Sequence, residues 1–162
     1  MSNNLSNIEH IDSNIIIDYL YPDKDKYNDN TARNYFTPKN PYNREIRVYT
    51  YAIGEVFRNL FIEKNNKKIS LEDQSFINKV DIIKSTIKII KLEELDKKNE
   101  FIEYYKQIQD IDNRIHTGDI IMLSAFFCDS DAKIFRTFDK GILDSKKIID
   151  YARGHNKKIL EV

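Results

Sequence analysis

The stretch Asn7–Leu20, NIEHIDSNIIIDYL, reads as a short strand that runs directly into a helix. The strand is expected to end at Asp12. Ser13 or Asn14 is expected to cap the helix over 15–20, because either side chain can accept a hydrogen bond from a free backbone amide. A strand that feeds a helix in this way is typical of an α/β domain with a parallel sheet.

The rest of the chain repeats this alternation. Short runs rich in β-branched residues predict further strands, and apolar residues at helical spacing predict helices between them. The predicted strands after the first cover 86–92, 132–138 and 157–162. The predicted helices cover 44–64, 71–85 (capped by Ser70), 100–111, 118–128 (capped by Thr117) and 145–155. We therefore predict a three-layer α/β sandwich, a central parallel sheet flanked by helices.

Length and composition place this fold in one domain over residues 1–162, of 19.2 kDa. The formal net charge is zero, so no overall field attracts nucleic acid or membrane. The lone Cys128 excludes a disulfide framework and suits a reducing compartment. Neither a secretory signal nor an apolar run of membrane-spanning length is present, so we expect a cytoplasmic protein without a membrane partner.

A polar stretch over residues 21–44 interrupts the pattern. It is rich in Asn, Asp, Lys and Tyr and contains all three prolines. This composition predicts a loop inserted within the domain, with one helical turn around NTARNYF (30–36).

Four acidic residues fall where the pattern puts one edge of the sheet: Asp12, Glu55, Asp119 and Asp139. Asp12 ends the first strand, Asp139 follows the strand over 132–138, and Asp119 lies in the first turn of a helix. Glu55 lies on a helix beside its core face. In open α/β sheets, ligands bind at the carboxyl ends of the strands. Taken alone, each acid can also be a surface, turn or capping residue. A ligand site is therefore predicted from the placement of all four acids at the same edge of the sheet.

Clustered carboxylates point to a metal site. Several acids close together raise one another's pKa unless a cation lies between them. Mg²⁺ and Mn²⁺ prefer carboxylate and water oxygens, together with substrate phosphate. A metal so held can activate water and stabilise charge at phosphorus. The absence of a Gly-rich phosphate loop argues against a nucleotide-binding fold of the P-loop or dinucleotide type.

Four segments, in this order, resemble the PIN-domain nucleases, which are best known from VapC-type toxins of toxin–antitoxin pairs. The matching segments are IDSNIIIDYL (11–20), YAIGEVFRNL (51–60), HTGDIIMLSAF (116–126) and IFRTFDKGIL (134–143). The resemblance implies a metal-dependent endoribonuclease that uses Mg²⁺ or Mn²⁺. If the protein is a toxin of this type, the resemblance also implies a small antitoxin as its partner.

The same resemblance assigns roles to residues. Asp12, Glu55, Asp119 and Asp139 match the first to fourth metal-binding acids and are the candidate catalytic residues. Asn14 and Thr137 match polar positions that support the site through hydrogen bonds, while capping and strand-end polarity are the alternatives from the residues alone.

The polar stretch over 21–44 is longer than in compact toxins of this family. One interpretation is a flap whose aromatic rings stack on unpaired bases, with Arg33 nearby. The rings concerned are those of Tyr19, Tyr21, Tyr27, Tyr35 and Phe36. The other interpretation is a loop packed against the sheet edge. Arg33, Tyr35 and Arg136 are the candidate contacts to substrate.

The sequence thus predicts a nuclease that hydrolyses phosphodiester bonds in single-stranded RNA. A catalytically inactive RNA-binding or scaffold protein of the same fold is the alternative, and near-neutral net charge favours it slightly. A nuclease for structured DNA is a weaker alternative, because no segment predicts a helical arch or helix–hairpin–helix. The apolar face of FRNLFIEK (57–64) is a candidate homodimer surface.

Overall fold

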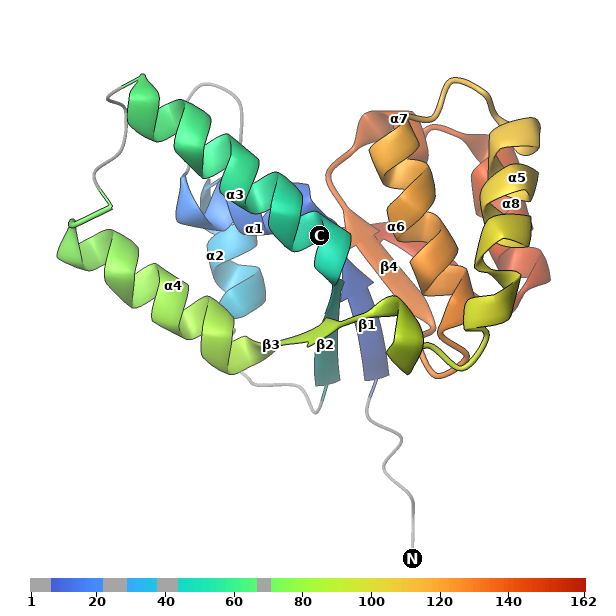
Figure 1. Ribbon diagram of the computed structural model, residues 1–162, viewed down its shortest axis with the longest axis horizontal. Coiled ribbons are helices and arrows are strands. Elements are labelled where there is room, and N and C mark those ends of the chain that lie inside the picture. The colour runs from blue at the N-terminus through green and yellow to red at the C-terminus, as the bar shows by residue number, and fades with distance from the viewer. Residues whose placement is uncertain (1–6, 22–28, 38–43, 67–70) are drawn as a thin grey trace, which may run out of the picture.

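The computed structural model describes residues 7–21, 29–37, 44–66 and 71–162 (Figure 1). Its strands form one five-stranded sheet in the order β3-β2-β1-β4-β5, and every pairing is parallel. The strands are β1 (Asn7–Ile11), β2 (Arg44–Tyr49), β3 (Ile87–Ile90), β4 (Ile134–Thr137) and β5 (Lys158–Glu161). The α-helices are α1 (Ser13–Leu20), α2 (Asp29–Phe36), α3 (Thr50–Asn65), α4 (Gln74–Thr86), α5 (Phe101–Ile111), α6 (Thr117–Cys128), α7 (Lys140–Leu143) and α8 (Lys146–Gly154). Single 3₁₀ turns, η1 (Leu92–Glu94) and η2 (Lys98–Glu100), connect β3 to α5.

Helices cover both faces of the sheet. Helices α1 to α4 lie on one side and α5 to α8 on the other (Figure 1). A parallel sheet needs this double cover, because its crossover connections place helices on the faces and its strands are buried from both sides. The predicted three-layer α/β sandwich with a central parallel sheet is therefore confirmed.

The predicted helix over 44–64 is wrong in its first part. Arg44–Tyr49 is strand β2, which pairs with β1 on one side and β3 on the other. Ile46 and Val48 are buried at alternate positions, as in a strand. The apolar spacing from Ile46 onward also fits a helix, so the local pattern was ambiguous. Pairing with two neighbouring strands decides it, because both sides of the β2 backbone then find hydrogen-bond partners.

The polar stretch over 21–44 contains more structure than one helical turn. Helix α2 (Asp29–Phe36) packs against α1 and α4. Tyr35 and Phe36 are buried, as is Tyr19 on α1, so these rings do not form an exposed stacking surface. These side chains are therefore packed, but as part of a helix against α1 and α4 and not as a loop at the sheet edge. Tyr27 lies outside the described residues.

Three helix starts differ from the predicted caps. Asp12 itself occupies the N-cap position of α1, and its side chain makes no capping hydrogen bond. His116 holds that position in α6, so Thr117 is already helical. In α4 the cap is Asp73, whose carboxylate accepts from the amides of Ser75 and Phe76. The consequence for Asp12 is that its carboxylate does not cap its own helix.

Helix α6 forms the centre of the core. Nearly every residue from Ile120 to Cys128 is buried, and α6 packs against α5 on its outer side. Phe126 contacts Phe127 and Phe135, with ring centroids 5.5 and 5.6 Å apart. Because α6 is fixed by this packing, its first turn is held in place at the carboxyl edge of the sheet.

A buried ionic cluster lies beyond the other end of α6. Asp129 accepts hydrogen bonds from His10 Nε2 at 2.8 Å and from Arg47 Nη1 at 2.7 Å. Burial alone would raise the pKa of Asp129, but these bonds hold it well below its ordinary value. Lys157 Nζ donates to the backbone oxygens of Asp129 and Ala132, at 2.6 Å each. This cluster ties β1 and β2 to the segment before β4 and to the residue before β5.

In the part of the chain that the structure describes, no helix combines the length and apolar character needed to cross a membrane.

Candidate metal centre at the carboxyl edge of the sheet

The four acids that the sequence singled out converge at the carboxyl ends of β1 and β4. Asp12 directly follows β1, and Asp139 lies two residues after the last residue of β4. Asp119 is in the first turn of α6, and Glu55 is in the second turn of α3, which directly follows β2. The side chains are close enough to influence one another's charge, because Asp12 interacts electrostatically with Glu55 and Asp139, and Asp119 with all three.

Asp12 is the most deeply buried of these acids, with 1% of its surface exposed. Burial raises its pKa to about 6, and repulsion from Glu55 and Asp139 adds to this. A hydrogen bond from Thr137 opposes the shift. A buried carboxylate that must share its surroundings with other acids holds its proton more tightly than one in water.

Asp119 has the same kind of environment. Burial raises its pKa to about 7, and the charges of Asp12, Asp139 and Glu55 raise it further. A backbone hydrogen bond at His116 acts in the opposite direction. For Asp12 and Asp119 alike, the causes that raise the pKa are burial and other acids, and none of the main influences on either group is a lysine or arginine.

Two side chains fix the orientation of Asp12. Thr137 Oγ1 donates to Asp12 Oδ2 at 2.6 Å, and Asn14 Nδ2 donates to the same oxygen at 2.7 Å. Thr137 Oγ1 in turn accepts from Asn14 Nδ2 and from the backbone amide of Asp139, at 3.1 and 2.9 Å. Asn14 Oδ1 accepts from the amide of Phe138. These bonds join the Asp12 carboxylate at the end of β1 to the end of β4 and to the backbone of Phe138 and Asp139.

Ser13 links Asp12 to Glu55. Its hydroxyl lies 2.8 Å from Glu55 Oε2 and 3.3 Å from Asp12 Oδ1. A hydroxyl has one proton to donate, and the shorter distance favours Glu55. Oδ1 of Asp12 therefore keeps most of its capacity to accept, while Oδ2 is taken by Thr137 and Asn14.

Gly118 makes room for Glu55. A β-carbon at this position would lie 2.8 Å from Glu55 Oε1 and 3.4 Å from the Tyr51 hydroxyl oxygen. Only a residue without a side chain lets the glutamate carboxylate lie against the start of α6. Glu55 is thereby held beside the helix turn that carries Asp119.

The donor set fits a hard divalent cation. It consists of carboxylate oxygens, which Mg²⁺ and Mn²⁺ prefer, whereas imidazole and thiolate ligands suit Zn²⁺ or copper. Without a cation between these acids, burial and mutual repulsion raise the pKa values of Asp12 and Asp119. Among the residues that the structure describes, no three His, Cys, Asp or Glu side chains form a preassembled metal-binding group. A cation would thus have to draw the carboxylates closer together.

The three candidate substrate contacts do not join this cluster. Arg136 Nη2 lies 3.3 Å from Glu9 Oε1 and its Nη1 donates to the backbone oxygen of Glu161 at 2.9 Å. Tyr35 is buried, and its hydroxyl donates to Glu9 Oε2 at 2.7 Å. Arg33 is exposed on α2 and lines a separate cavity. Arg136 and Tyr35 therefore serve an ion-pair network around Glu9.

Sequence reasoning gave Ser13 only a capping role and gave Gly118 none. Both residues nevertheless have a feature in the sequence that points to the acid cluster. Ser13 directly follows the first acid, and Gly118 directly precedes the third, so each is adjacent in sequence to a residue of the cluster. Their function depends on Glu55, which is distant in sequence, and a linear pattern does not reveal that contact.

Comparisons with known proteins agree with the fold. No protein-family model matches the chain, and no curated protein sequence matches it. Among solved structures, the chain is similar to a chain of VapBC2 from Rickettsia felis, crystallised bound to a DNA fragment from their promoter. The TM-score is 0.57 at 17% sequence identity, and the match covers 96% of this chain and 98% of that chain. At this identity the likeness concerns the fold, and it supports the PIN-like architecture that the sequence resemblance implied.

Proposed function

We propose that this protein is a Mg²⁺- or Mn²⁺-dependent endoribonuclease that hydrolyses phosphodiester bonds in single-stranded RNA. The observation that carries the proposal is the pair of raised pKa values at Asp12 and Asp119 within a cluster of four acids. Clusters of this kind are more common at functional sites than elsewhere in proteins. The PIN-like fold and the place of the cluster at the carboxyl edge of the sheet support the same conclusion.

Each acid has a role in the proposal. Asp12 and Asp119 would hold the cation, Glu55 would complete the set from α3, and Asp139 would contribute from the turn before α7. Asp139 Oδ1 accepts from the amide of Ile142 at 3.1 Å, so one of its oxygens already serves as a helix cap. A bound Mg²⁺ or Mn²⁺ would supply activation of water and stabilisation of charge at the phosphorus.

The surrounding residues would position these acids. Thr137 and Asn14 hold Asp12 Oδ2, so Oδ1 is the oxygen left to bind a cation. Ser13 donates a hydrogen bond to Glu55 Oε2, and the Glu55 carboxylate lies against Gly118 in the first turn of α6. In this arrangement the protein orients the carboxylates, and a bound cation would draw them closer together.

The test is a cleavage assay on labelled single-stranded RNA with Mn²⁺, with Mg²⁺ and with chelator. We expect cleavage with either cation and none with chelator. Asp12→Asn and Asp119→Asn should each lower the rate by at least about a hundredfold, given the magnitude typical of lost charge stabilisation. Asp81→Asn, at an exposed acid of α4, is the matched control. Full activity in both site variants would refute the proposal. RNA retention without metal-stimulated cleavage would favour the inactive RNA-binding alternative.

The toxin role and the antitoxin partner are also proposals. They are supported by the similarity to VapBC2 and by the sequence resemblance to VapC-type toxins. A small protein encoded beside this one would be the candidate partner. Co-expression of the two should abolish RNA cleavage, and growth arrest should follow expression of this chain alone. Normal growth despite measurable ribonuclease activity would argue for a housekeeping nuclease.

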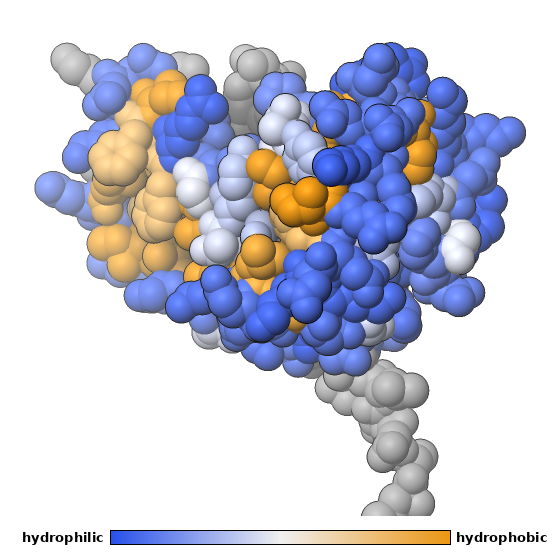
Figure 2. Space-filling view, turned by 45° about the vertical axis from the view of Figure 1, so that its right-hand side comes forward, coloured by the Kyte–Doolittle hydropathy of each residue, from blue (hydrophilic) through white to orange (hydrophobic). Residues whose placement is uncertain are grey.

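An apolar surface on α3 and α4 is available for a protein partner (Figure 2). Phe57 and Phe61 lie one turn apart on α3 and are 58% and 61% exposed, with Ile62 and Ile77 also exposed nearby. Its part on α3 is the face of residues 57–64 that the sequence offered as a homodimer surface. Sedimentation of the wild-type protein and of Phe61→Ser tests it, because the variant should sediment as a monomer if pairing uses this face.

A further inference from the structure

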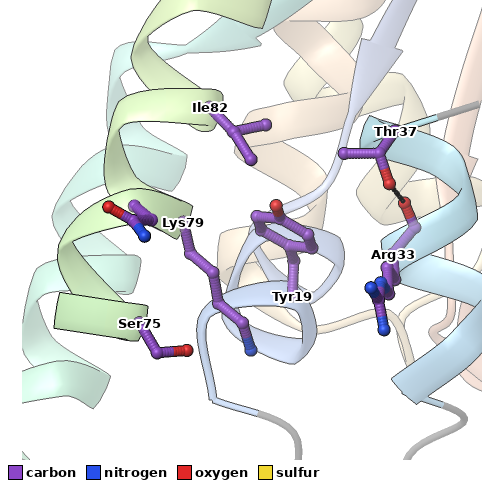
Figure 3. A pocket seen from close by; sticks show the side chains of 7 residues that line it. Tyr19, Arg33, Thr37, Ser75, Lys79 and Ile82 are labelled. Atoms are coloured by element: carbon purple, nitrogen blue, oxygen red, sulfur yellow. Dashed lines mark hydrogen bonds between the residues drawn. The ribbon is translucent and has the colours of Figure 1, made fainter. Parts of the chain in front are cut away.

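A cavity of about 600 Å³ lies between α1, α2 and α4 (Figure 3). It is separate from the four acids, none of which lines it. The residues that line it are Tyr19, Arg33, Thr37, Ser75, Asn78, Lys79 and Ile82. Its volume falls in the range of pockets that hold small organic ligands, and it is larger than a lone phosphate requires.

The lining has the chemistry of an anion site. Arg33 on α2 and Lys79 on α4 bring two cations to the cavity from different helices, and Ser75 and Asn78 add a hydroxyl and an amide. Among the described lining residues there is no carboxylate, although the chain carries equal numbers of acidic and basic residues. Arginine and lysine with neutral donors beside them are typical of phosphate recognition.

Tyr19 lies between the two cations. Its ring stands between Lys79 and Arg33 (Figure 3), and Lys79 Nζ lies 5.6 Å from the ring centroid. Arg33 is near enough that its charge lowers the pKa of the Tyr19 hydroxyl against the larger raising effect of burial. Thr37 Oγ1 donates to the backbone oxygen of Arg33 at 2.7 Å, which closes the end of α2 beside the cavity. The cations are thus arranged around a fixed aromatic ring.

The cavity and the acid cluster are joined by a single helix. Asp12 is the N-cap of α1, and Tyr19 is in its last turn. At 1.5 Å of rise per residue, the two positions are roughly 10 Å apart along the helix axis. Under the proposed function, this separation is short enough for a single RNA strand to contact both the acids and the cavity.

We infer that the Arg33–Lys79 cavity binds a phosphate-bearing nucleotide of the single-stranded RNA substrate, away from the bond that is cleaved. The inference rests on the proposed function for the identity of the strand. It gives the cavity a binding role and no part in the chemical step. Arg33 is thereby a substrate contact through this cavity.

The test measures RNA affinity without cleavage. In an Asp12→Asn background, a labelled single-stranded RNA oligomer is titrated by fluorescence anisotropy at several salt concentrations. Arg33→Gln and Lys79→Gln should each weaken binding about threefold to tenfold and flatten the salt dependence, because each removes a phosphate contact. Lys84→Gln removes the same charge from an exposed position of α4 outside the cavity and should leave affinity unchanged. Lys79→Arg should retain most of the binding.

In the cleaving protein, Arg33→Gln and Lys79→Gln should raise KM and leave kcat unchanged, since the cavity does not touch the reacting bond. Circular dichroism and melting curves check that both variants fold. Affinity equal to the parent protein in both, or an equal loss in Lys84→Gln, would overturn the inference. So would a free nucleoside monophosphate or inorganic phosphate that binds as tightly as the oligomer.

The two proposals fail in different ways. If the wild-type protein cleaves RNA through its acids but the cavity variants bind RNA normally, only the cavity assignment is wrong. If no cleavage occurs with either cation but the cavity variants lose RNA binding, the ribonuclease proposal is wrong and the cavity assignment stands.

Discussion

Glu55 Oε1 lies against Gly118 so closely that a β-carbon on the glycine would sit 2.8 Å from it. Contacts this short do not occur between a β-carbon and another heavy atom, so one of the two groups must move if a side chain is added. The backbone of α6 is fixed by its buried packing, whereas a glutamate carboxylate ends a flexible chain. The glutamate is therefore the group that moves.

Gly118→Ala should consequently impair function more than stability. We expect metal-dependent RNA cleavage to fall by about tenfold or more, since small displacements of catalytic groups have effects of this size. The free energy of unfolding should change by less than about 1 kcal/mol, because alanine favours the helix and the displaced side chain is flexible. Cleavage rates and denaturant unfolding measure the two effects.

Gly54→Ala is the control for that variant. Gly54 is in the same helix as Glu55, and a β-carbon there would meet nothing within 4 Å. Replacing a glycine inside a helix should stabilise the protein by about 0.4–1 kcal/mol and leave cleavage unchanged. Equal activity in Gly118→Ala and Gly54→Ala would show that the close contact with Glu55 does not matter for function.

A second prediction concerns pH and stability. The pKa of Asp119 is raised from 3.8 to about 7 in the folded protein, so the folded state binds the proton more tightly than the unfolded chain. This group's contribution to stability is fully present below about pH 4 and is lost as the pH rises through 7. Asp119 is partly exposed, so solvent screens its interactions. We therefore expect the effect on the free energy of unfolding to be about 1–2 kcal/mol.

Asp119→Asn removes this titration. In chelator, the melting temperature of the variant should exceed that of the wild-type protein by roughly 2–8 °C at pH 8.5, with a smaller difference at pH 5. Asp81→Asn should show no such dependence. A constant difference between Asp119→Asn and the wild type across this pH range would contradict the assignment of the raised pKa to the acid cluster.

A third prediction concerns metal. At a Mn²⁺ concentration about a hundredfold above its dissociation constant, the folded state should gain about 2.7 kcal/mol. The gain should shrink when the pH is lowered through 7 and 6, because protons on Asp119 and Asp12 compete with the cation. Melting curves with and without Mn²⁺ at pH 5 and pH 8 measure this. Asp12→Asn should lose most of the gain, and an undiminished gain in that variant would place the metal elsewhere.

The fold class and the four candidate acids could be predicted from the sequence. The strand that ends at Asp12 and the helix that begins beside Asp119 have strong local signals, and the carboxyl edge of a parallel sheet follows from them. Strand β2 was missed because Ile46, Tyr49 and Ile53 also recur at helical spacing. Local pattern does not show that two neighbouring strands will bind the same segment, and that pairing is what decides its structure.

Contacts between residues that are distant in sequence could not be predicted from the sequence. His10, Arg47 and Asp129 form a buried ionic cluster, yet they are 37 and 82 residues apart in sequence order and none lies in a recognisable motif. A side chain such as Asp129 is read from sequence as a solvated acid until the fold buries it. Its lowered pKa is a property of the packed neighbours and has no local signal.

The last prediction separates the hydroxyl of Thr137 from its bulk. Thr137 is fully buried, donates to Asp12 Oδ2 at 2.6 Å and accepts from the amide of Asp139. Thr137→Val keeps the shape but removes both of these bonds and the one that Thr137 Oγ1 accepts from Asn14 Nδ2, which should cost about 1–3 kcal/mol of stability. Because the lost bond had lowered the pKa of Asp12, the pH midpoint for metal-dependent cleavage should move to higher pH in the valine variant. Thr137→Ser keeps the hydroxyl and should retain the wild-type midpoint, whatever stability it loses from the missing methyl group. The pH–rate profiles of the three proteins decide the matter, and a shared midpoint would mean that Thr137 does not act through Asp12.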